Sequence, residues 1–315
     1  MFSTIVVGVD GHEGGRAALA LAQCVGDAAG GSIVAVHVQP YEPIPMRGPR
    51  PDLEASTREE SHELLGMQLA VSGVAARVHV AADSSPARGL HAVAEGLDAD
   101  LIVVGSPHRG PVGRILAEDT VRGVLHGASC PVLVARHDDL DASLGRRVVG
   151  VGYDGSRQSR AGLRWAQRLA EVIDGSVRLL CAAEPAQAFS PAISYGINWV
   201  ALAPERREHA ERLVAEAVAE LGARATGEAV VGMADDELLR FSKDVDLLVL
   251  GSRGYGAVRR TLLGSTSDRL VDAAACPVVV IPRGGHDERA TDGSEGTGKA
   301  KDEPDRVRAD EVAAR

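Results

Sequence analysis

The strongest constraint in this sequence is an internal repeat: the first half matches the second when the two are offset by 144 to 146 residues. The matching segments, in pairs, are TIVVGVDG and VVGVGYDGS, GGSIVAVHV and DGSVRLLCA, DADLIVVGS and DVDLLVLGS, and SCPVLVA and ACPVVVI. All four pairs occur in the same order in both halves. Such a repeat predicts two copies of one domain, and 315 residues are enough for each copy to bury its own core.

Within each half, short apolar runs alternate with longer segments rich in Ala, Leu and Arg. We therefore expect strands at approximately 3–9, 32–38, 76–81, 101–105 and 131–135, with counterparts about 145 residues later. The first helices are expected at 17–29 and 161–173. Strands that alternate with helices favour right-handed crossovers and a parallel sheet covered on both faces. The predicted fold class is α/β, with two repeated doubly wound five-stranded parallel sheets.

The composition agrees with this fold class and excludes two kinds of partner. Hydrophobic residues make up 45% of the chain and aromatic residues only 3%, so the core must consist mainly of the aliphatic side chains that line buried parallel strands. The formal net charge of -10 offers no basic surface to a nucleic acid or an anionic membrane. Because no leader peptide or long apolar segment is recognisable, we expect a cytoplasmic protein.

We place the domain boundary in the polar segment between the two halves. Residues 1–138 form the first predicted domain, 139–146 a linker that belongs to neither core, and 147–284 the second domain. Residues 285–315 contain almost no large apolar side chains, and we expect them to be a disordered tail.

The cysteines and tryptophans show no pattern that requires chemistry. The cysteines lack the spacing of a metal site and are expected to be buried, reduced thiols: Cys24, Cys130, Cys181 and Cys276. Trp165 is expected on the core face of a helix. Trp199 lies in a predicted loop segment, 191–204, and is a candidate lid over a crevice.

A glycine-rich loop in the second half predicts a binding site for phosphate. The predicted strand Leu247–Leu250 runs into GSRGYGAVRRTLLGSTSDRL, in which Gly251 and Gly254 precede Gly264 and Ser265. Glycines let a backbone approach an anion, and the N–H groups at the start of the following helix face it. A tight turn before a helix would explain any single one of these glycines equally well.

An acidic residue on another strand of the same half strengthens this prediction. The first strand ends in YDGS, which contains Asp154. Ligands of doubly wound sheets bind beyond the carboxyl ends of the strands, at the point where the strand order reverses. If the first and fourth strands are neighbours there, Asp154 and the loop face one crevice. The carboxylate would suit a ribose or an adenine edge, and the loop would suit the phosphates.

At these residues the chain resembles the universal stress protein family, with its VxVDxS-like start, its G-x2-G-x9-G-[ST] loop and its final CPV strand. The resemblance covers nearly all of residues 1–283, twice over. It implies an adenine nucleotide alpha hydrolase-like fold with strand order 3-2-1-4-5 and, in members that keep the loop, binding of ATP, with or without Mg²⁺. The family has no Walker A lysine. The nucleotide contacts that the resemblance implies are Asp154, Ala182, Gly251, Arg253, Gly254, Gly264, Ser265, Thr266 and Ser267.

The first half departs from the pattern of this loop. Gly105 is retained, but His108 stands at the position of the second glycine, and Glu118 with Asp119 replaces the later Gly-Ser pair. A carboxylate ~5 Å from a phosphate costs roughly 3 kcal/mol at an effective dielectric constant near 20. The same acids would suit a helix N-terminus, where they cap N–H groups and replace the ligand. We expect the first domain to bind ATP weakly or not at all.

The leading functional hypothesis is a nucleotide-dependent stress-response or regulatory module, in which ATP in the second domain changes a surface that an unknown protein partner reads. A slow ATP hydrolase or phosphotransferase is the alternative from another class, although no catalytic base or nucleophile is recognisable. We name no catalytic residues and no metal ligands. Binding of cyclic AMP, and of flavin as in electron-transfer relatives of this fold, is also left open.

The last strands of the two halves are candidates for pairing with each other. These segments, 131–135 and 277–281, would then form a pseudo-dimer within one chain. Such pairing would shield strand edges that otherwise favour aggregation. A homodimer of the whole chain is a further hypothesis.

Overall fold

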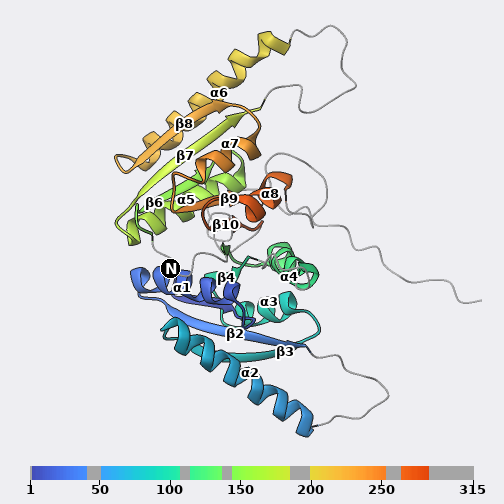
Figure 1. The fold of residues 1–315 in the computed structure, drawn as a ribbon. Coiled ribbons are helices and arrows are strands. Elements are labelled where there is room, and N and C mark those ends of the chain that lie inside the picture. The colour runs from blue at the N-terminus through green and yellow to red at the C-terminus, as the bar shows by residue number, and fades with distance from the viewer. Residues whose placement is uncertain are drawn as a thin grey trace, which may run out of the picture.

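The computed structural model describes residues 2–40, 51–106, 114–136, 144–184, 199–252 and 264–283. Both halves consist of strands that alternate with helices (Figure 1). The elements of the first half are β1 (Thr4–Gly8), α1 (Glu13–Ala29), β2 (Ser32–Pro40), α2 (Pro51–Ser72), β3 (Arg77–Asp83), α3 (Pro86–Gly96), β4 (Leu101–Gly105), α4 (Arg114–Gly127) and β5 (Val132–Ala135). Those of the second half are β6 (Val148–Gly152), α5 (Arg157–Val172), β7 (Ser176–Ala183), α6 (Trp199–Leu221), β8 (Ala225–Val231), α7 (Ala234–Phe241), β9 (Leu247–Gly251), α8 (Ser265–Ala273) and β10 (Val278–Ile281).

The described strands form one sheet, in the order β3-β2-β1-β4-β5-β10-β9-β6-β7-β8. The α/β class and the order 3-2-1-4-5 in each half are confirmed, and the pairs within each half are parallel. Among the described strands the two halves join through an antiparallel pair, β5 with β10, so the sheets continue into each other.

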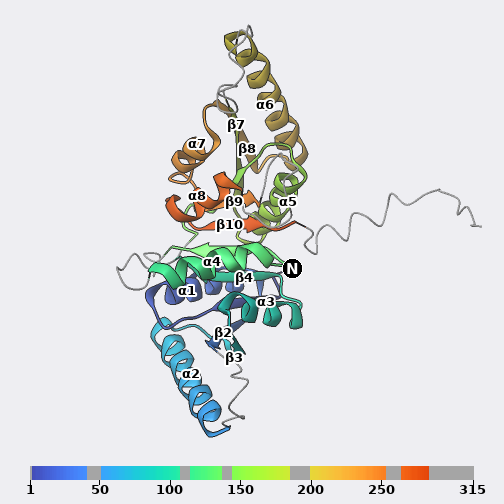
Figure 2. The same cartoon turned by 90° about the vertical axis from the view of Figure 1, so that its right-hand side faces the viewer.

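The strand pair at this junction is symmetric with respect to the repeat. Leu133 pairs with Val279, its own counterpart at an offset of 146, and the flanking valines pair in the mirrored order. This register is what a two-fold axis between the halves requires. The predicted pairing of 131–135 with 277–281 within the chain is therefore confirmed. Figure 2 shows β10 between the rest of the second half and the strands of the first.

Helices cover both faces of the sheet, and the strands are buried on both sides as a result. Of the two large hydrophobic clusters, one contains residues of α1, α2, α5 and α6, and the other contains residues of α3, α4, α7 and α8. A small third cluster joins α6 to the end of β7. Successive strand residues alternate between the two clusters, so that Ile5 and Val7 belong to the first and Val6 to the second. Burial on both faces explains why the strands read as continuous apolar runs.

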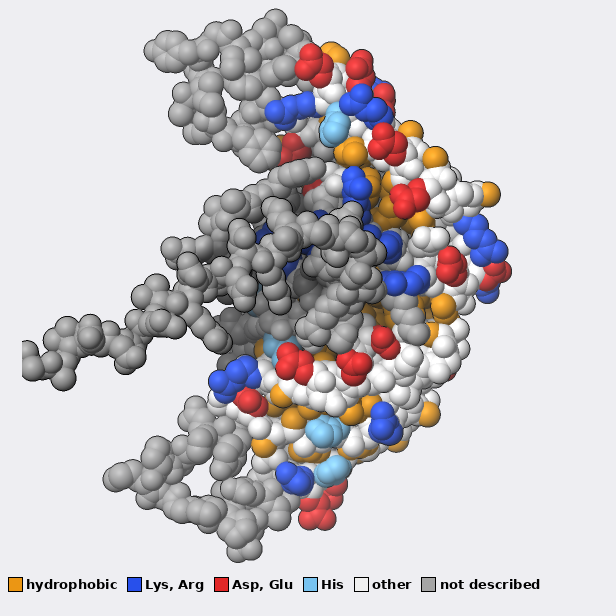
Figure 3. All heavy atoms as spheres, turned by 180° about the vertical axis from the view of Figure 1, so that it is seen from behind, with side chains coloured by type: hydrophobic (Ala, Val, Ile, Leu, Met, Phe, Trp, Pro, Cys, Tyr) orange, Lys and Arg blue, Asp and Glu red, His pale blue; other side chains and the backbone are white. Residues whose placement is uncertain are grey.

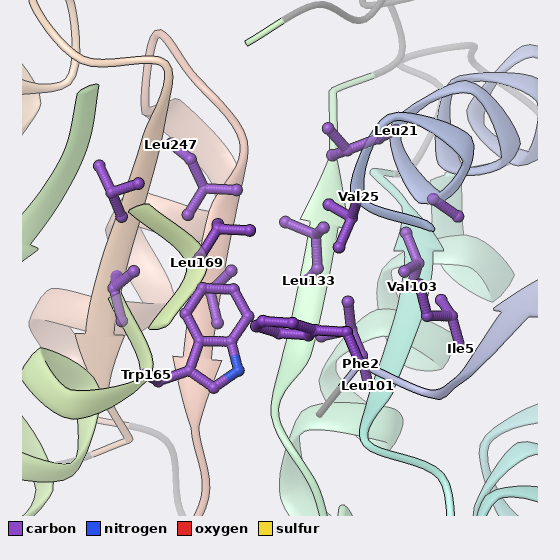
Figure 4. Packing of buried hydrophobic residues seen from close by; sticks show 14 of the residues in the cluster. Phe2, Ile5, Leu21, Val25, Leu101, Val103, Leu133, Trp165, Leu169 and Leu247 are labelled. Carbon is purple, nitrogen blue, oxygen red and sulfur yellow. The ribbon is translucent and has the colours of Figure 1, made fainter. Parts of the chain in front are cut away.

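The first of these clusters continues from one half into the other. Phe2, at the start of the first half, packs edge-on against Trp165 of α5 in the second, with ring centroids 5.3 Å apart and an interplanar angle of 89° (Figure 4). Both side chains are fully buried, as expected for Trp165. Leu144, within the predicted linker, is also buried in this cluster, so the expectation that the linker avoids both cores is wrong at that residue.

The start of α6 corrects another local expectation. We expected 191–204 to be a loop, but α6 begins at Trp199 and continues through Pro204. The hypothesis that Trp199 acts as a lid depends on its side chain, which lies outside the described part of the structure. Three cysteines are buried, whereas Cys24 is only partly buried, and all four are free thiols.

Two glycine backbones bring α1 against β4, and this contact yields a stability prediction. A Cβ added to Gly105 would lie 2.1 Å from the Gly14 carbonyl oxygen, a distance at which backbone must move. We expect Gly105→Ala to lower the free energy of unfolding by about 1–3 kcal/mol, as in other overpacked sites. Urea denaturation followed by circular dichroism measures this loss.

Gly66 provides the matched control for this substitution. A Cβ at Gly66, within α2, would meet no atom within 4 Å. Gly66→Ala is therefore expected to leave stability unchanged or raise it by up to about 1 kcal/mol, because alanine favours a helix over glycine. Similar unfolding midpoints for Gly105→Ala and the unsubstituted protein would contradict the packing argument.

Candidate functional site

The candidate site lies at the carboxyl ends of two neighbouring parallel strands of the second half, β6 and β9. The turn after β6 contains Asp154 and the loop after β9 starts at Gly251, so both leave the sheet at the same edge. The strand order reverses here, because β7 lies beyond β6 and β10 lies beyond β9. The sequence predicts that Asp154 and the loop face one crevice if the first and fourth strands of this half are neighbours. β6 and β9 are neighbours, so this condition is met.

The turn that leads into α5 holds Asp154. Its Oδ1 accepts a hydrogen bond from the Ser156 N–H at 2.9 Å. Gly155, between them, has a φ of 73°, which a residue with a side chain rarely adopts. Ser156 then caps α5, its Oγ accepting from the Ser159 N–H at 3.2 Å. The carboxylate is thus fixed by backbone at this edge of the sheet.

Hydrogen bonds tie the two ends of the glycine-rich loop together. The Gly264 N–H donates to the Ser252 carbonyl at 2.9 Å. The Ser267 hydroxyl, which is buried, donates to the Gly251 carbonyl at 2.9 Å. The side chain of Ser267 therefore closes the loop. Only the backbone N–H of Ser267 is left to face a ligand.

Part of the predicted site is not covered by the structure. Residues 253–263 lie outside the described residues, and the predicted contacts Arg253 and Gly254 are among them. The other predicted contacts in this loop, Gly251 and Gly264 to Ser267, are described and lie together where β9 ends and α8 begins. Asp154 and Ala182 lie on the neighbouring strand ends.

The N-terminus of α8 has the properties of an anion site. α8 begins at Ser265, directly after the N-cap residue Gly264, which as a glycine offers no side chain to cap the helix. First-turn N–H groups have no partner within their own helix. Together with the helix dipole they attract negative charge. Ser265, Thr266 and Ser267 supply these groups at the edge where Asp154 also lies.

An arginine of the first half balances the acidic charge on α8. Arg122 on α4 donates through Nε to Asp268 at 2.9 Å and through Nη2 to Asp272 at 2.7 Å. The hydrogen bond to Asp268 raises the pKa of the Arg122 guanidinium. Asp268 lies in the first turn of α8, where an unbalanced carboxylate would repel a phosphate.

Arg122 is absent from the residues singled out from the sequence, although the repeat contains a signal for it. At an offset of 146 residues Arg122 corresponds to Asp268, so the charge at this position changes sign between the halves. The two side chains meet because the halves pair about their symmetry axis. Ser159 is likewise absent from those residues, and its Oγ accepts a hydrogen bond from the Asp154 N–H at 3.4 Å.

Gly251 has a packing role that is independent of any ligand. A Cβ on Gly251 would lie 2.7 Å from the Gln158 Cβ, in the first turn of α5. Gly105 has the same relation to α1 in the first half. Close packing of a helix on a strand end therefore explains this glycine by itself, and the case for a phosphate site depends on Gly264 and the first turn of α8.

Ala182 lies near the carboxyl end of β7, the strand that pairs with β6. On its other side it pairs with Val230 of β8. Its neighbour Cys181 is buried, and burial, followed by the charge of Asp154, raises the pKa of this thiol to about 11. Burial likewise raises the pKa of Cys130 to about 12. Both cysteines therefore stay protonated near neutral pH and are poor nucleophiles.

The first half has no helix start at the positions that correspond to Gly264 and Ser265. α4 begins at Arg114, so Glu118 and Asp119 lie in its second turn, although they occupy the repeat positions of Gly264 and Ser265. The expectation that these acids stand at a helix N-terminus is wrong. When the two halves are aligned by the repeat, α4 begins earlier than α8. The backbone N–H groups at these positions therefore donate to carbonyls of α4 itself. His108 lies outside the described residues.

Neither a metal centre nor a membrane segment emerges from the described residues. No three His, Cys, Asp or Glu side chains in the described ranges are grouped to hold a metal ion. Within the same ranges no helix combines the length and apolar character of a membrane span. On the face shown in Figure 3, acidic and basic side chains of both halves are interspersed.

Comparison with known proteins gives relatives that match nearly the whole chain or about half of it. Universal stress protein Rv2319c of Mycobacterium tuberculosis is 28% identical over 310 residues, which cover 89% of this chain and 99% of that protein. A universal stress protein of Thermus aquaticus is 31% identical over 139 residues, which cover 43% of this chain and all of that protein. One from Mycolicibacterium smegmatis is 30% identical, and the match spans 62% of its length.

A solved structure supports the arrangement of the fold. The crystal structure of a universal stress protein from Archaeoglobus fulgidus superposes with a TM-score of 0.64 at 22% identity, and the match covers 91% of this chain and 98% of that one. Fold and site together define a tandem, doubly wound α/β protein whose candidate ligand edge lies at the carboxyl ends of its strands. The chain belongs to the universal stress protein family, whose sequence model matches residues 1–136 and 145–282.

Proposed function

We propose that this protein binds an adenine nucleotide, ATP in particular, in its second domain and acts as a nucleotide-dependent stress-response or regulatory module. The observation that carries the proposal is the pairing of β6 with β9. It brings the Asp154 carboxylate and the N-terminus of α8 to one edge of the sheet. A carboxylate can accept hydrogen bonds from ribose hydroxyls, and a helix N-terminus can hold phosphates.

The proposed site uses main-chain donors in place of a lysine. Ser265, Thr266 and Ser267 would supply N–H groups to the phosphates, with Arg253 and Gly254 as further contacts implied by the sequence. Ala182 would lie against the adenine through its backbone. A Mg²⁺ ion, where present, would arrive with the nucleotide. Binding of cyclic AMP in the same place and slow hydrolysis of ATP are the competing proposals.

Other parts of the proposal concern organisation. The family model's two matches, to residues 1–136 and 145–282, support a division into domains 1–138 and 147–284. The linker 139–146, the disordered tail 285–315, a further homodimer, an unknown protein partner and a cytoplasmic location stay predictions of the sequence.

The experiment that tests this function is calorimetric titration of the full chain with ATP, ADP and cyclic AMP, combined with Asp154→Asn. Asparagine keeps an oxygen for the Ser156 N–H but removes the charge that would strengthen a bond to ribose. We expect ATP affinity to fall roughly 10-fold, the effect of losing about 1.5 kcal/mol from a charge-assisted hydrogen bond.

Asp10→Asn is the matched control, because Asp10 occupies the equivalent turn of the first half and accepts from the His12 N–H at 3.0 Å. This variant should bind ATP like the unsubstituted protein. The absence of heat with every adenine nucleotide would refute nucleotide binding. Release of phosphate from ATP in the same samples would favour the hydrolase.

A further inference from the structure

Two arginines of the first half contact opposite ends of α8, the helix whose first turn belongs to the proposed nucleotide site. Arg122 of α4 donates to Asp268, in that first turn, at 2.9 Å and to Asp272 at 2.7 Å. At the other end of the helix the Arg136 guanidinium donates to the Ala274 carbonyl. Both contacts cross the junction of the two halves, where α4 and α8 approach each other (Figure 2).

The repeat does not supply the reverse of these contacts. At an offset of 146 residues Arg122 corresponds to Asp268, and Arg136 corresponds to Pro282. Neither an ionised carboxylate nor a proline ring has a side-chain donor, so these two positions of the second half cannot hold α4 in the same way. The first half therefore contributes charged side chains to the helix of the proposed site through a relation that is not symmetric.

Asp268 gives the contact with Arg122 a consequence for a ligand. Its carboxylate lies in the first turn of α8, and a carboxylate that close to a bound phosphate repels it. The next residue, Arg269, is engaged elsewhere, since its guanidinium pairs with Asp235 and Asp236 of α7. Arg122 therefore supplies the positive charge that is paired with Asp268.

The planar guanidinium of Arg122 suits this role better than a single point charge. Its Nε and Nη2 bind two carboxylates that are four residues apart and therefore lie one turn apart on the same face of α8. This arrangement fixes α8 against α4 and offsets both acidic charges. The Arg122 side chain is 31% exposed and that of Asp268 is 44% exposed, so salt can screen the pair.

We propose that Arg122 is a positioning residue of the nucleotide site in the second domain, through which the first domain raises the affinity of that site for phosphate. Arg122 acts through Asp268 and touches no ligand itself. This inference rests on the proposed function, because it takes the first turn of α8 as the place where phosphates bind. Since coupling between two sites is reciprocal, a bound nucleotide in turn strengthens the contact between the halves.

Calorimetric titration of the full chain with ATP tests this role in the variant Arg122→Gln. We expect ATP affinity to fall about 5-fold, the effect of leaving the charge of Asp268 unbalanced at a partly exposed position. The loss should shrink as salt is added. Arg122→Lys keeps the positive charge, and it should retain most of the affinity.

Asp268→Asn separates the effect of charge from that of the contact between the halves. This variant breaks the ion pair but also removes the repelling carboxylate, so it should bind ATP at least as tightly as the unsubstituted protein. Adding Arg122→Gln to it should then change the affinity by less than about 2-fold. If the pair served only to hold the halves together, Asp268→Asn would weaken ATP binding as Arg122→Gln does.

Arg178→Gln is the matched control for the loss of an arginine. Arg178 pairs with Glu228 at 2.8 Å, and the two side chains are 37% and 45% exposed, close to the values for Arg122 and Asp268. It lies toward the amino end of β7, at the opposite edge of the sheet from the proposed site. This variant should bind ATP like the unsubstituted protein, and a loss equal to that of Arg122→Gln would contradict a specific role.

Inorganic pyrophosphate distinguishes this inference from the proposed function. Nuclear magnetic resonance of the full chain follows the backbone amides of the first turn of α8, Ser265 to Ser267. We expect pyrophosphate to shift these signals in a saturable manner, with weaker binding in Arg122→Gln than in the unsubstituted protein. If this order appears while ATP gives no heat, nucleotide binding is refuted and the role of Arg122 stands.

Three results would overturn the role of Arg122. The first is equal affinity of Arg122→Gln and the unsubstituted protein for ATP and for pyrophosphate, which would leave nucleotide binding intact. The second is a loss of affinity in Asp268→Asn as large as that in Arg122→Gln. The third is a first turn of α8 whose amides respond to neither ligand, which would refute the phosphate site as well.

Discussion

Ser265→Asp is expected to weaken ATP binding by about 100-fold. Ser265 is the first residue of α8, in the N-terminal turn proposed to hold the phosphates. A carboxylate ~5 Å from a phosphate charge costs roughly 3 kcal/mol at an effective dielectric constant near 20. An aspartate would also satisfy N–H groups of the first turn and replace the ligand there. The change recreates the residue that the first half has at this repeat position, Asp119.

Calorimetry at two salt concentrations measures this effect and its electrostatic origin. The loss of affinity should shrink as salt is added, because ions screen the repulsion. Ser176→Asp is the matched control: it adds the same charge at the amino end of β7, the opposite edge of the sheet. Equal ATP affinity in Ser265→Asp and the unsubstituted protein would place the phosphates elsewhere.

Trp165→Ala is expected to lower the free energy of unfolding by about 3–5 kcal/mol, the usual cost of removing a large buried aromatic side chain. Trp165 is 1% exposed and packs against Phe2, which is fully buried. Because these rings come from different halves of the chain (Figure 4), the substitution also weakens the contact between the halves. Urea denaturation followed by circular dichroism should show a lower midpoint and less cooperative unfolding.

Trp165→Phe provides the comparison that isolates packing. Phenylalanine keeps an aromatic ring against Phe2 and removes the indole Nε1, a buried donor for which the described structure holds no partner. Its stability loss should therefore be well below that of Trp165→Ala, since an unsatisfied buried polar group is itself costly. A loss as large in Trp165→Phe as in Trp165→Ala would contradict this account of the junction.

The repeat made most of the fold predictable. Apolar runs of four to eight residues, interrupted at fixed positions by helical segments, are typical of strands buried on both faces. The observed strands differ from the expected ones by a residue or two at most ends, as with β1 at Thr4–Gly8. The first helices, however, begin about four residues earlier than expected, at Glu13 and Arg157. Polar residues of the first turn carry no apolar period, so periodicity alone does not reveal them.

The candidate site was predictable in type but only partly in detail. Glycine spacing and Asp154 identified the strand ends that the structure brings together. The start of α4 was not predictable from Glu118 and Asp119, because acids suit both a first turn and a helix interior. The role of Gly251 in packing against Gln158 was equally hidden, since that contact depends on where α5 lies.

By itself the sequence determined that the chain is a duplicated, doubly wound α/β protein whose second half has a glycine-rich loop after its fourth strand. These properties reside in local order along the chain: strand-length apolar runs, glycine spacing and the repeat offset. Only the tertiary structure decided the antiparallel register of β5 on β10 and the contact of Arg122 with Asp268. Each of these results from contacts between residues distant in sequence, and packing in three dimensions selects such contacts.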